Sequence, residues 1–125
     1  MPGARLCRHL TSGSTGGLET WRHCNLRVPR RAKYKGPTRV VLSTTVYQRH
    51  RPDVILGLIT TRSADPLCPT DYEISDSDSA GLHARSCFRL YVVTMLQEDV
   101  RVVGRLSGGD WDEVKLRVQV GIVGE

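Results

Sequence analysis

The stretch Arg51–Arg62, R-P-D-V-I-L-G-L-I-T-T-R, places the tightest constraint on the fold of this chain. Its apolar run is short, rich in β-branched residues and bounded by Pro52 and a polar loop, which predicts a buried strand. The run ends in two hydroxyls and a guanidinium, those of Thr60, Thr61 and Arg62. A rigid strand that delivers small donors and a cation to a surface is suited to holding a phosphodiester. The alternative is a core strand that happens to end in a polar loop.

The length and hydropathy of the chain predict one small domain. Its 125 residues are enough to build a core without disulfide bonds. Hydrophobic residues make up 39% and aromatic residues 6%, so the expected core is mostly aliphatic. No apolar run approaches the roughly eighteen residues of a membrane helix. The basic N-terminus lacks the apolar stretch of a secretory signal. The expectation is therefore a soluble cytoplasmic protein.

Charge is distributed unevenly along the chain. Residues 1–51 hold eleven Lys and Arg and one acidic residue, a net charge of +10. Residues 52–125 hold seven Lys and Arg and twelve acidic residues, a net charge of −5. This asymmetry favours a polyanionic partner for the basic half and a solvated acidic face for the other. The alternative is a basic disordered arm with no specific role.

Two parts of the chain differ in composition. Residues 1–33 are basic and Gly/Ser-rich, with S-G-S-T-G-G at 12–17 and almost no periodicity, which is typical of a flexible or partly ordered segment. Residues 34–125 have regular hydrophobic patterns and are the expected domain. The cysteines Cys7, Cys24, Cys68 and Cys87 form no C-x-x-C pair and are expected to be reduced thiols. A zinc site made of Cys7, His9, His23 and Cys24 is disfavoured, because the spacing does not match the zinc-finger pattern.

The predicted elements are short strands followed by one helix. Strands are expected at Arg39–Ser43, Asp53–Ile59, Asp71–Ser75, Ser86–Thr94 and Asp99–Gly104, with a loop or single helical turn at Thr44–Arg51. A helix is expected to start at Ser107–Asp110, with an apolar stripe of Trp111, Val114, Val118 and Ile122 and an i,i+4 pair of Glu113 and Arg117. This order predicts a compact, mostly antiparallel, barrel-like α+β domain.

Several enzyme classes lack their motifs here. The chain has no phosphate-binding P-loop, no dinucleotide fingerprint, no H-E-x-x-H and no G-x-S-x-G, and its four histidines are dispersed. The remaining chemistry is that of hydroxyl groups and arginines. RNA cleavage can use these groups, because the ribose 2′-hydroxyl is itself a nucleophile. Arginine can neutralise charge on the phosphate while threonine holds a non-bridging oxygen. Arg39 and Thr60 would converge if their strands are neighbours.

Four collinear blocks resemble the MazF/PemK-type toxins of bacterial toxin–antitoxin systems. They are T-R-V-V-L-S-T-T-V-Y-Q (Thr38–Gln48), R-P-D-V-I-L-G-L-I-T-T-R (Arg51–Arg62), G-L-H-A-R-S-C-F-R-L (Gly81–Leu90) and G-R-L-S-G-G-D-W-D-E-V (Gly104–Val114). Together they cover roughly residues 34–122. The resemblance implies an α+β, mostly β fold, namely a small SH3-like barrel with a C-terminal helix. It also implies a homodimeric, metal-independent endoribonuclease with no cofactor, which cuts single-stranded mRNA at short sequences and is inhibited by a cognate antitoxin.

The same resemblance suggests which residues form the site. The family's catalytic threonine corresponds to Thr60, and its arginine is best matched by Arg39, which is displaced by one or two positions. Apart from the resemblance, the residues expected to contact RNA are Lys35, Arg49, His50, Thr61 and Arg62, and Gln48 is a further candidate. Ser86 and Arg89 fall in a matched block; for Arg89 the alternative is a surface salt bridge. Lys35 is the alternative catalytic cation.

Two departures from the family support other interpretations. Residues 1–33 show no first strand of the family's G-D-I-V-x-V type, so that either Asn25–Val28 replaces it poorly or the barrel lacks that strand. A one-residue slip would turn Arg39 to the opposite face. These departures favour a non-catalytic relative that binds RNA or an antitoxin-like peptide without cleavage. A generic basic RNA-binding module is disfavoured, because the few aromatic residues are not clustered for base stacking.

Overall fold

The computed structural model describes residues 3–10, 34–61 and 68–124. It contains six strands: β1 (Arg5–Leu10), β2 (Tyr34–Val41), β3 (Asp53–Thr60), β4 (Tyr72–Glu73), β5 (Cys87–Leu96) and β6 (Val100–Arg105). Its helices are α2 (Thr45–His50), the 3₁₀ turn η1 (Gln97–Asp99) and α3 (Gly108–Ile122). Within the described ranges, no helix is long and apolar enough to cross a membrane.

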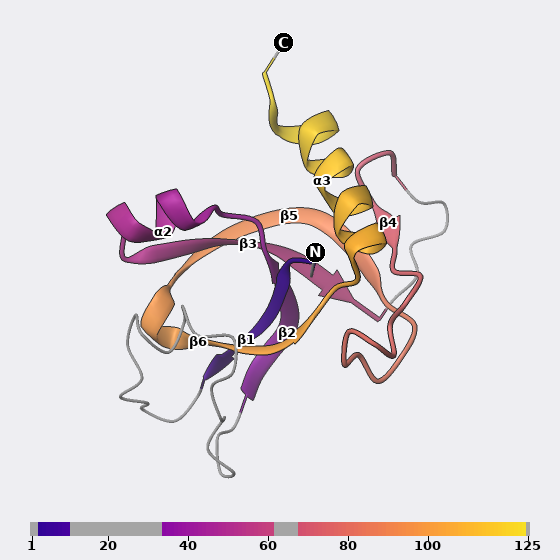
Figure 1. The fold of residues 1–125 in the computed structure, drawn as a ribbon, viewed down its shortest axis with the longest axis horizontal. Helices are drawn as coiled ribbons and strands as arrows, with labels where there is room; N and C mark the ends of the chain where they lie inside the picture. The colour runs from indigo at the N-terminus through magenta and orange to yellow at the C-terminus, as the bar shows by residue number, and fades with distance from the viewer. Residues whose placement is uncertain (1–2, 11–33, 62–67, 125) are drawn as a thin grey trace.

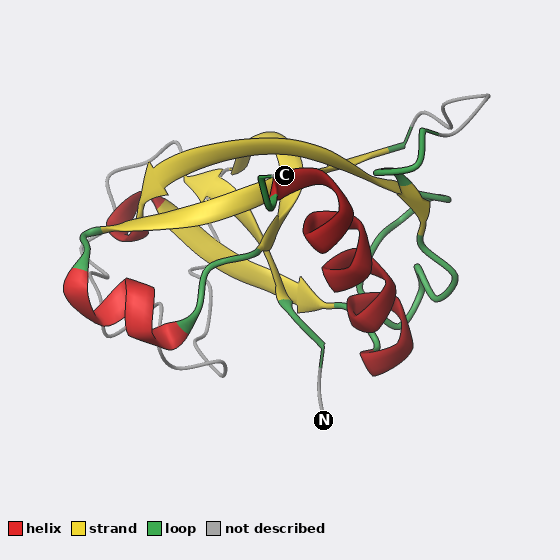
Figure 2. Ribbon diagram, turned by 90° about the horizontal axis from the view of Figure 1, so that it is seen from above, coloured by secondary structure: helices red, strands yellow, loops and turns green. Residues whose placement is uncertain are grey.

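The strands form one antiparallel sheet in the order β4-β5-β3-β2-β1-β6. Figure 1 shows β3 and β5 arching over β6, β1 and β2, so the sheet curves round like a barrel wall. The end strands β4 and β6 do not pair with each other in the part of the chain described, and the barrel is therefore open. The predicted mostly-β α+β fold with a C-terminal helix is confirmed, as Figure 2 shows from above.

The sheet has a strand in the N-terminal segment where none was expected. β1 pairs with β2 on one side and with β6 on the other, so the expectation that residues 1–33 lack a first strand is wrong. Arg8 and His9 interrupt the apolar alternation of Leu6, Cys7 and Leu10, and this hid the strand in the sequence. The Gly/Ser-rich stretch and Asn25–Val28 lie outside the described residues, and the division of the chain after residue 33 stays a prediction.

The other elements agree with their predictions in kind and differ at their ends. β4 is only two residues long, and the segment at 44–51 is a short helix whose first turn is capped by the Thr44 hydroxyl. α3 begins within the expected start at Ser107–Asp110, where the Ser107 hydroxyl caps the helix by accepting a hydrogen bond from the Asp110 amide at 3.1 Å. Val114 is buried and the Glu113–Arg117 ion pair is present, but Ile122 is exposed, so the apolar stripe ends before it.

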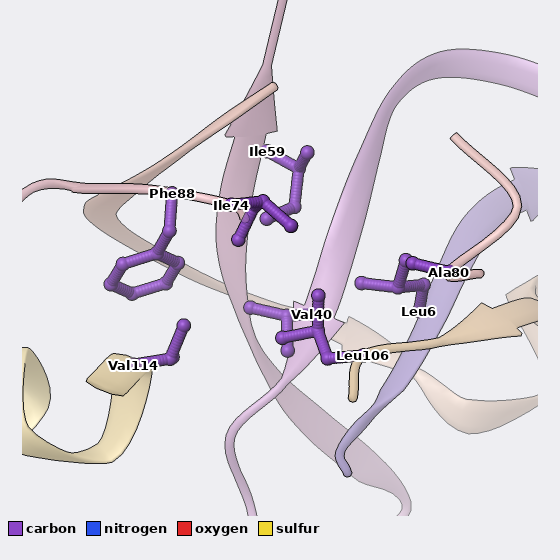
Figure 3. Packing of buried hydrophobic residues seen from close by; sticks show 8 residues of the cluster. All are labelled: Leu6, Val40, Ile59, Ile74, Ala80, Phe88, Leu106 and Val114. Carbon is purple, nitrogen blue, oxygen red and sulfur yellow. The ribbon is translucent and has the colours of Figure 1, made fainter. Parts of the chain in front are cut away.

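Two apolar clusters lie on opposite faces of the sheet. The helix-side core consists of Leu6, Val40, Ile59, Ile74, Ala80, Phe88, Leu106 and Val114. The second core consists of Cys7, Val41, Val54, Leu56 and Val100. Neighbouring residues in β1 and β2 divide between the two clusters, as alternation in a strand requires. Figure 3 shows Val114 of α3 and the ring of Phe88 facing each other in the helix-side core.

Strand β3 changes its buried face at Gly57. Val54 and Leu56 belong to the second core, whereas Ile59 belongs to the helix-side core. A Cβ on Gly57 would lie 2.6 Å from a ring carbon of Phe88, so only glycine allows this close approach. The change of face leaves Leu58 and Thr60 half-buried at the end of the strand, outside the second core.

A buried carboxylate fastens the start of α3 to the segment at 72–76. Asp110 accepts hydrogen bonds from the Tyr72 hydroxyl at 2.6 Å, the Ser75 hydroxyl at 2.7 Å, and the amides of Ser75 and Asp76 at 3.0 Å each. Burial acts to raise the pKa of Asp110, but these hydrogen bonds outweigh it and lower the pKa to about 2. The carboxylate therefore stabilises the fold in its ionised form.

Replacing Gly57 with alanine should destabilise the protein. The added methyl group would overlap the Phe88 ring, and overpacking of this kind costs about 1–3 kcal/mol of unfolding free energy. Urea unfolding followed by circular dichroism measures the loss. Gly109→Ala is the matched control: a Cβ there would meet no atom within 4 Å, and alanine favours the helix by up to about 1 kcal/mol. Equal stability of the two variants would contradict the packing argument.

Asp110→Asn should lower the unfolding free energy by about 2 kcal/mol at neutral pH, the value that corresponds to a pKa of about 2 against the usual 3.8. The stabilisation is complete above pH 3.8 and is lost as the pH falls through about 2, so wild type and variant should converge there. Urea unfolding from pH 7 down to pH 2 measures this difference. Asp112→Asn, at an exposed position of the same helix, should have little effect; a constant difference at every pH would refute the assignment.

Candidate active site

Thr60 and Thr61 lie at the end of β3, where the sheet borders a cavity of about 340 Å³. Three strands and one loop supply its walls. Its polar lining residues are Arg8, Thr38, Thr60, Thr61, His83 and Ser86. The cavity therefore combines a cation, an imidazole and several hydroxyls from segments that are far apart in the sequence.

Among the described residues, the cation that lines this cavity is Arg8, which the sequence did not indicate. Its guanidinium donates a hydrogen bond at 2.9 Å to the carbonyl of Gly36. Gly36 has a φ of +73° and lies where the β1–β2 register shifts, so the backbone there needs glycine. Arg8 is thus held against the first half of β2. The only sequence signal was a basic residue in a segment that did not look like a strand.

Arg39 lies on the strand next to Thr60. It is directly opposite Leu58 of β3, and Thr60 is two residues further along that strand. Opposite residues share a face and so do alternate residues, which places Arg39 and Thr60 on the same face of the sheet. Arg39 does not line the cavity, however. It also pairs with Cys7 of β1, whose pKa burial raises to about 12 against the charges of Arg39 and Arg5.

Arg89 lies on the same face of the sheet as Arg39 and Thr60, but on a third strand. It is directly opposite Leu58 on the β5 side, so Arg39 and Arg89 flank Leu58 on the face that carries Thr60. Its Nε is buried without a hydrogen-bond partner, and no ion pair of Arg89 is found within residues 3–10, 34–61 and 68–124. Burial raises the pKa of Cys87, which is opposite Thr60, and the charge of Arg89 opposes that rise. Two arginines on neighbouring strands therefore share the face of the sheet that carries Thr60.

The residues predicted on α2 lie at the other end of β3. Arg49 and His50 are exposed and precede the strand, whereas Thr60 ends it, about 25 Å away for eight extended residues. Figure 1 shows α2 and the tip of β3 at opposite ends of the sheet. Lys35 is in β2, but its side chain is not described, and Arg62 lies outside the described residues. Thr61 therefore lies beside Thr60 in the structure, whereas Arg49 and His50 do not.

Gln48 and Ser86 have structural contacts. Gln48 is buried: its side-chain oxygen accepts from the Ser43 hydroxyl at 3.3 Å, and its backbone carbonyl accepts from the Gln97 amide at 2.9 Å. The expectation that Gln48 contacts RNA is therefore wrong. Ser86 is also buried and donates to the Ala84 carbonyl at 2.8 Å, which shapes the loop at residues 81–86 beside the cavity.

The described residues offer no metal site. None of their histidines, cysteines and carboxylates form a group of three or more that could hold an ion. Cys7 is buried and its raised pKa keeps it a thiol, which makes it a poor ligand. His23 and Cys24 lie outside the described ranges, so the four-residue zinc hypothesis cannot be assembled from this part of the chain. Cys7, Cys68 and Cys87 are free thiols.

Solved structures share this fold. No family model and no curated protein sequence matches the chain. The Mycobacterium tuberculosis toxin MazF-mt6 is 19% identical, with a TM-score of 0.58 over 69% of this chain and 85% of that chain. A structure described as an Mtb toxin is 18% identical, with a TM-score of 0.59 over 70% and 93%. An endoribonuclease in complex with its cognate antitoxin, from a mycobacterial species, is 12% identical, with a TM-score of 0.62 over 100% of both chains.

At these identities the likeness is one of fold. The molecule is a small α+β protein whose curved antiparallel sheet carries one C-terminal helix. More specifically, its fold is that of the MazF-type toxin structures, as the four sequence blocks predicted.

Proposed function

We propose that this chain is the toxin of a toxin–antitoxin system, a metal-independent endoribonuclease that cuts single-stranded mRNA at specific short sequences. The observation that supports this most is the position of the Thr60 hydroxyl. It ends a central strand, borders a cavity and shares its sheet face with Arg39 and Arg89. Solved proteins with this fold include structures described as endoribonucleases.

The proposed chemistry needs no protein nucleophile. The ribose 2′-oxygen attacks the adjacent phosphorus as the bond to the 5′-oxygen breaks, which leaves a 2′,3′-cyclic phosphate and a 5′-hydroxyl. Negative charge grows on the non-bridging oxygens in the transition state. Thr60 donates a hydrogen bond to one of them and Arg39 supplies positive charge, the two roles that stabilise such a transition state most.

The RNA strand would extend along β3 away from the cut. Thr61 and the predicted contacts Lys35 and Arg62 would hold the phosphates beside Thr60. Arg49 and His50 lie about 25 Å away along the strand, so they would contact nucleotides some distance from the cut. Because these contacts are mostly ionic, we expect binding to weaken steeply as salt increases.

We also propose that the protein is cytoplasmic and that it binds protein partners. One solved structure of this fold is an endoribonuclease bound to its cognate antitoxin, and we infer that this chain also has an antitoxin and forms a homodimer. Exposed apolar side chains support a partner surface on β5 and α3. They are Tyr91, Val92, Leu116 and Val120.

A non-catalytic relative is the second candidate. The observation in its favour is that Arg39 does not line the cavity that Thr60 borders. Such a protein would bind RNA or an antitoxin-like peptide through the same basic face and would not cut.

We expect the purified protein to cut single-stranded RNA in the presence of EDTA, since the proposed chemistry uses no metal. Thr60→Ala and Arg39→Ala should each lower the single-turnover rate by about 100-fold or more, the usual effect of removing one donor to developing charge. Gel analysis of a 5′-labelled mRNA fragment measures the rate. Thr94→Ala, at an exposed position of β5, is the matched control and should leave the rate unchanged.

Cleavage at an undiminished rate by both the Thr60 and Arg39 variants would remove the proposed mechanism. Salt-sensitive RNA binding by the wild type without any cleavage would instead support the non-catalytic relative. Circular dichroism of each variant confirms that it is folded before rates are compared.

A further inference from the structure

The proposed reaction requires a group that accepts the proton of the 2′-hydroxyl. Thr60 and Arg39 cannot do this, because a hydroxyl is a very weak base and a guanidinium remains protonated at any ordinary pH. Among the described residues, six polar side chains line the cavity, and five of them are hydroxyls or a guanidinium. The sixth is His83, and imidazole is the side chain whose ordinary titration falls between pH 5 and 8.

We infer that His83 is the general base of this site, and that Arg8, on the same cavity as Thr60, contacts the phosphate that is cut. This inference rests on the proposed endoribonuclease function and assigns it two residues to which the sequence resemblance gives no role. The supporting observation is the juxtaposition of His83, Arg8 and Thr60, from the 81–86 loop, β1 and β3, around one cavity.

The backbone that carries His83 is anchored although its side chain is exposed. The Leu82 amide donates to the Ser77 carbonyl at 3.0 Å, and the Gly81 amide donates to the Asp78 carbonyl at 3.1 Å. Gly81 has a φ of +83°, a conformation that favours glycine. His83 therefore stands on a fixed turn, with its ring accessible to a substrate in the cavity.

The charges that face His83 come from several elements. Arg8 of β1 lies on the same cavity. His83 also lines a second cavity of about 640 Å³, together with Asp76, Asp78 and the ion-paired Glu73 and Arg85. The guanidinium of Arg8 is thus a positive charge on one cavity, and the carboxylates of Asp76 and Asp78 are negative charges on the other. Glu73 and Arg85 are paired to each other, and the other two carboxylates that line this second cavity are those of Asp76 and Asp78.

The step balances without any further reactant. Neutral His83 takes the proton of the 2′-hydroxyl while the 2′-oxygen bonds to phosphorus and the bond from phosphorus to the 5′-oxygen breaks. The 5′-oxygen leaves with a proton from water, and the imidazolium returns its proton to the solvent. Arg8 contacts a non-bridging oxygen throughout with its fork of donors.

The test is the pH dependence of single-turnover cleavage in EDTA between pH 5 and 9. For the wild type, we expect the rate to rise about tenfold per pH unit at the acidic end and then level off. His83→Ala should lower the plateau rate by about 10²–10⁴, the usual contribution of a general base, and should lose the acidic limb. Added imidazole should restore part of the rate of His83→Ala.

Two further variants separate a chemical role from a structural one. His9→Gln removes an imidazole of β1 that does not line the cavity and should keep the wild-type profile. Arg8→Ala should lower the rate at every pH and leave the midpoint of the profile in place, and Arg8→Lys should recover part of that loss.

The outcomes are distinguishable. A wild type that does not cut RNA contradicts the proposed function and removes this inference with it. If the wild type cuts and His83→Ala keeps the same profile, the inference alone is overturned. A uniform loss of rate in folded His83→Ala and His83→Gln, with the acidic limb intact and no rescue by imidazole, also overturns it.

Discussion

The close contact between Gly57 and the Phe88 ring allows one strand to serve two cores. β3 lies inside the sheet, between β2 and β5, and its first half buries one face while its second half buries the other. The change of face directs Ile59 into the core beneath α3 and leaves Leu58 and Thr60 on a partly open surface. A side chain at position 57 would separate β3 from the helix-side core, and with it the hydroxyl that ends the strand.

Arginines from three strands lie around the end of β3 that carries Thr60. Strand register places Arg39 and Arg89 beside Leu58 on the face to which Thr60 belongs, whereas Arg8 reaches the cavity from β1. The helix-side walls of this cavity depend on the segment at 72–86, which Asp110 fastens to α3 through four hydrogen bonds. Stability of the helix packing and geometry of the candidate site are thus connected through one buried carboxylate.

Much of the fold could be predicted because its signals are local. The apolar runs that became β2, β3, β5 and β6, and the stripe that became α3, repeat with the period of their own element. β1 was missed because its arginines and histidine break that period: they point to surfaces that only the neighbouring strands define. Gln48 was misread for a related reason, since its polarity suggested exposure and its burial depends on Ser43 and Gln97.

The sequence by itself determined the class of fold, the strand that ends in Thr60 and the hydroxyl-plus-arginine character of the chemistry, because each is written in a contiguous stretch. Only the tertiary structure decided that Arg39 shares a sheet face with Thr60, that Arg89 flanks the same position, and that Arg8 and His83 meet at the cavity. Those neighbours are separated by up to 75 positions in the sequence, the distance from Arg8 to His83. The register of strand pairing and the order of the strands in the sheet bring these residues together, and neither can be predicted from the local pattern of residues.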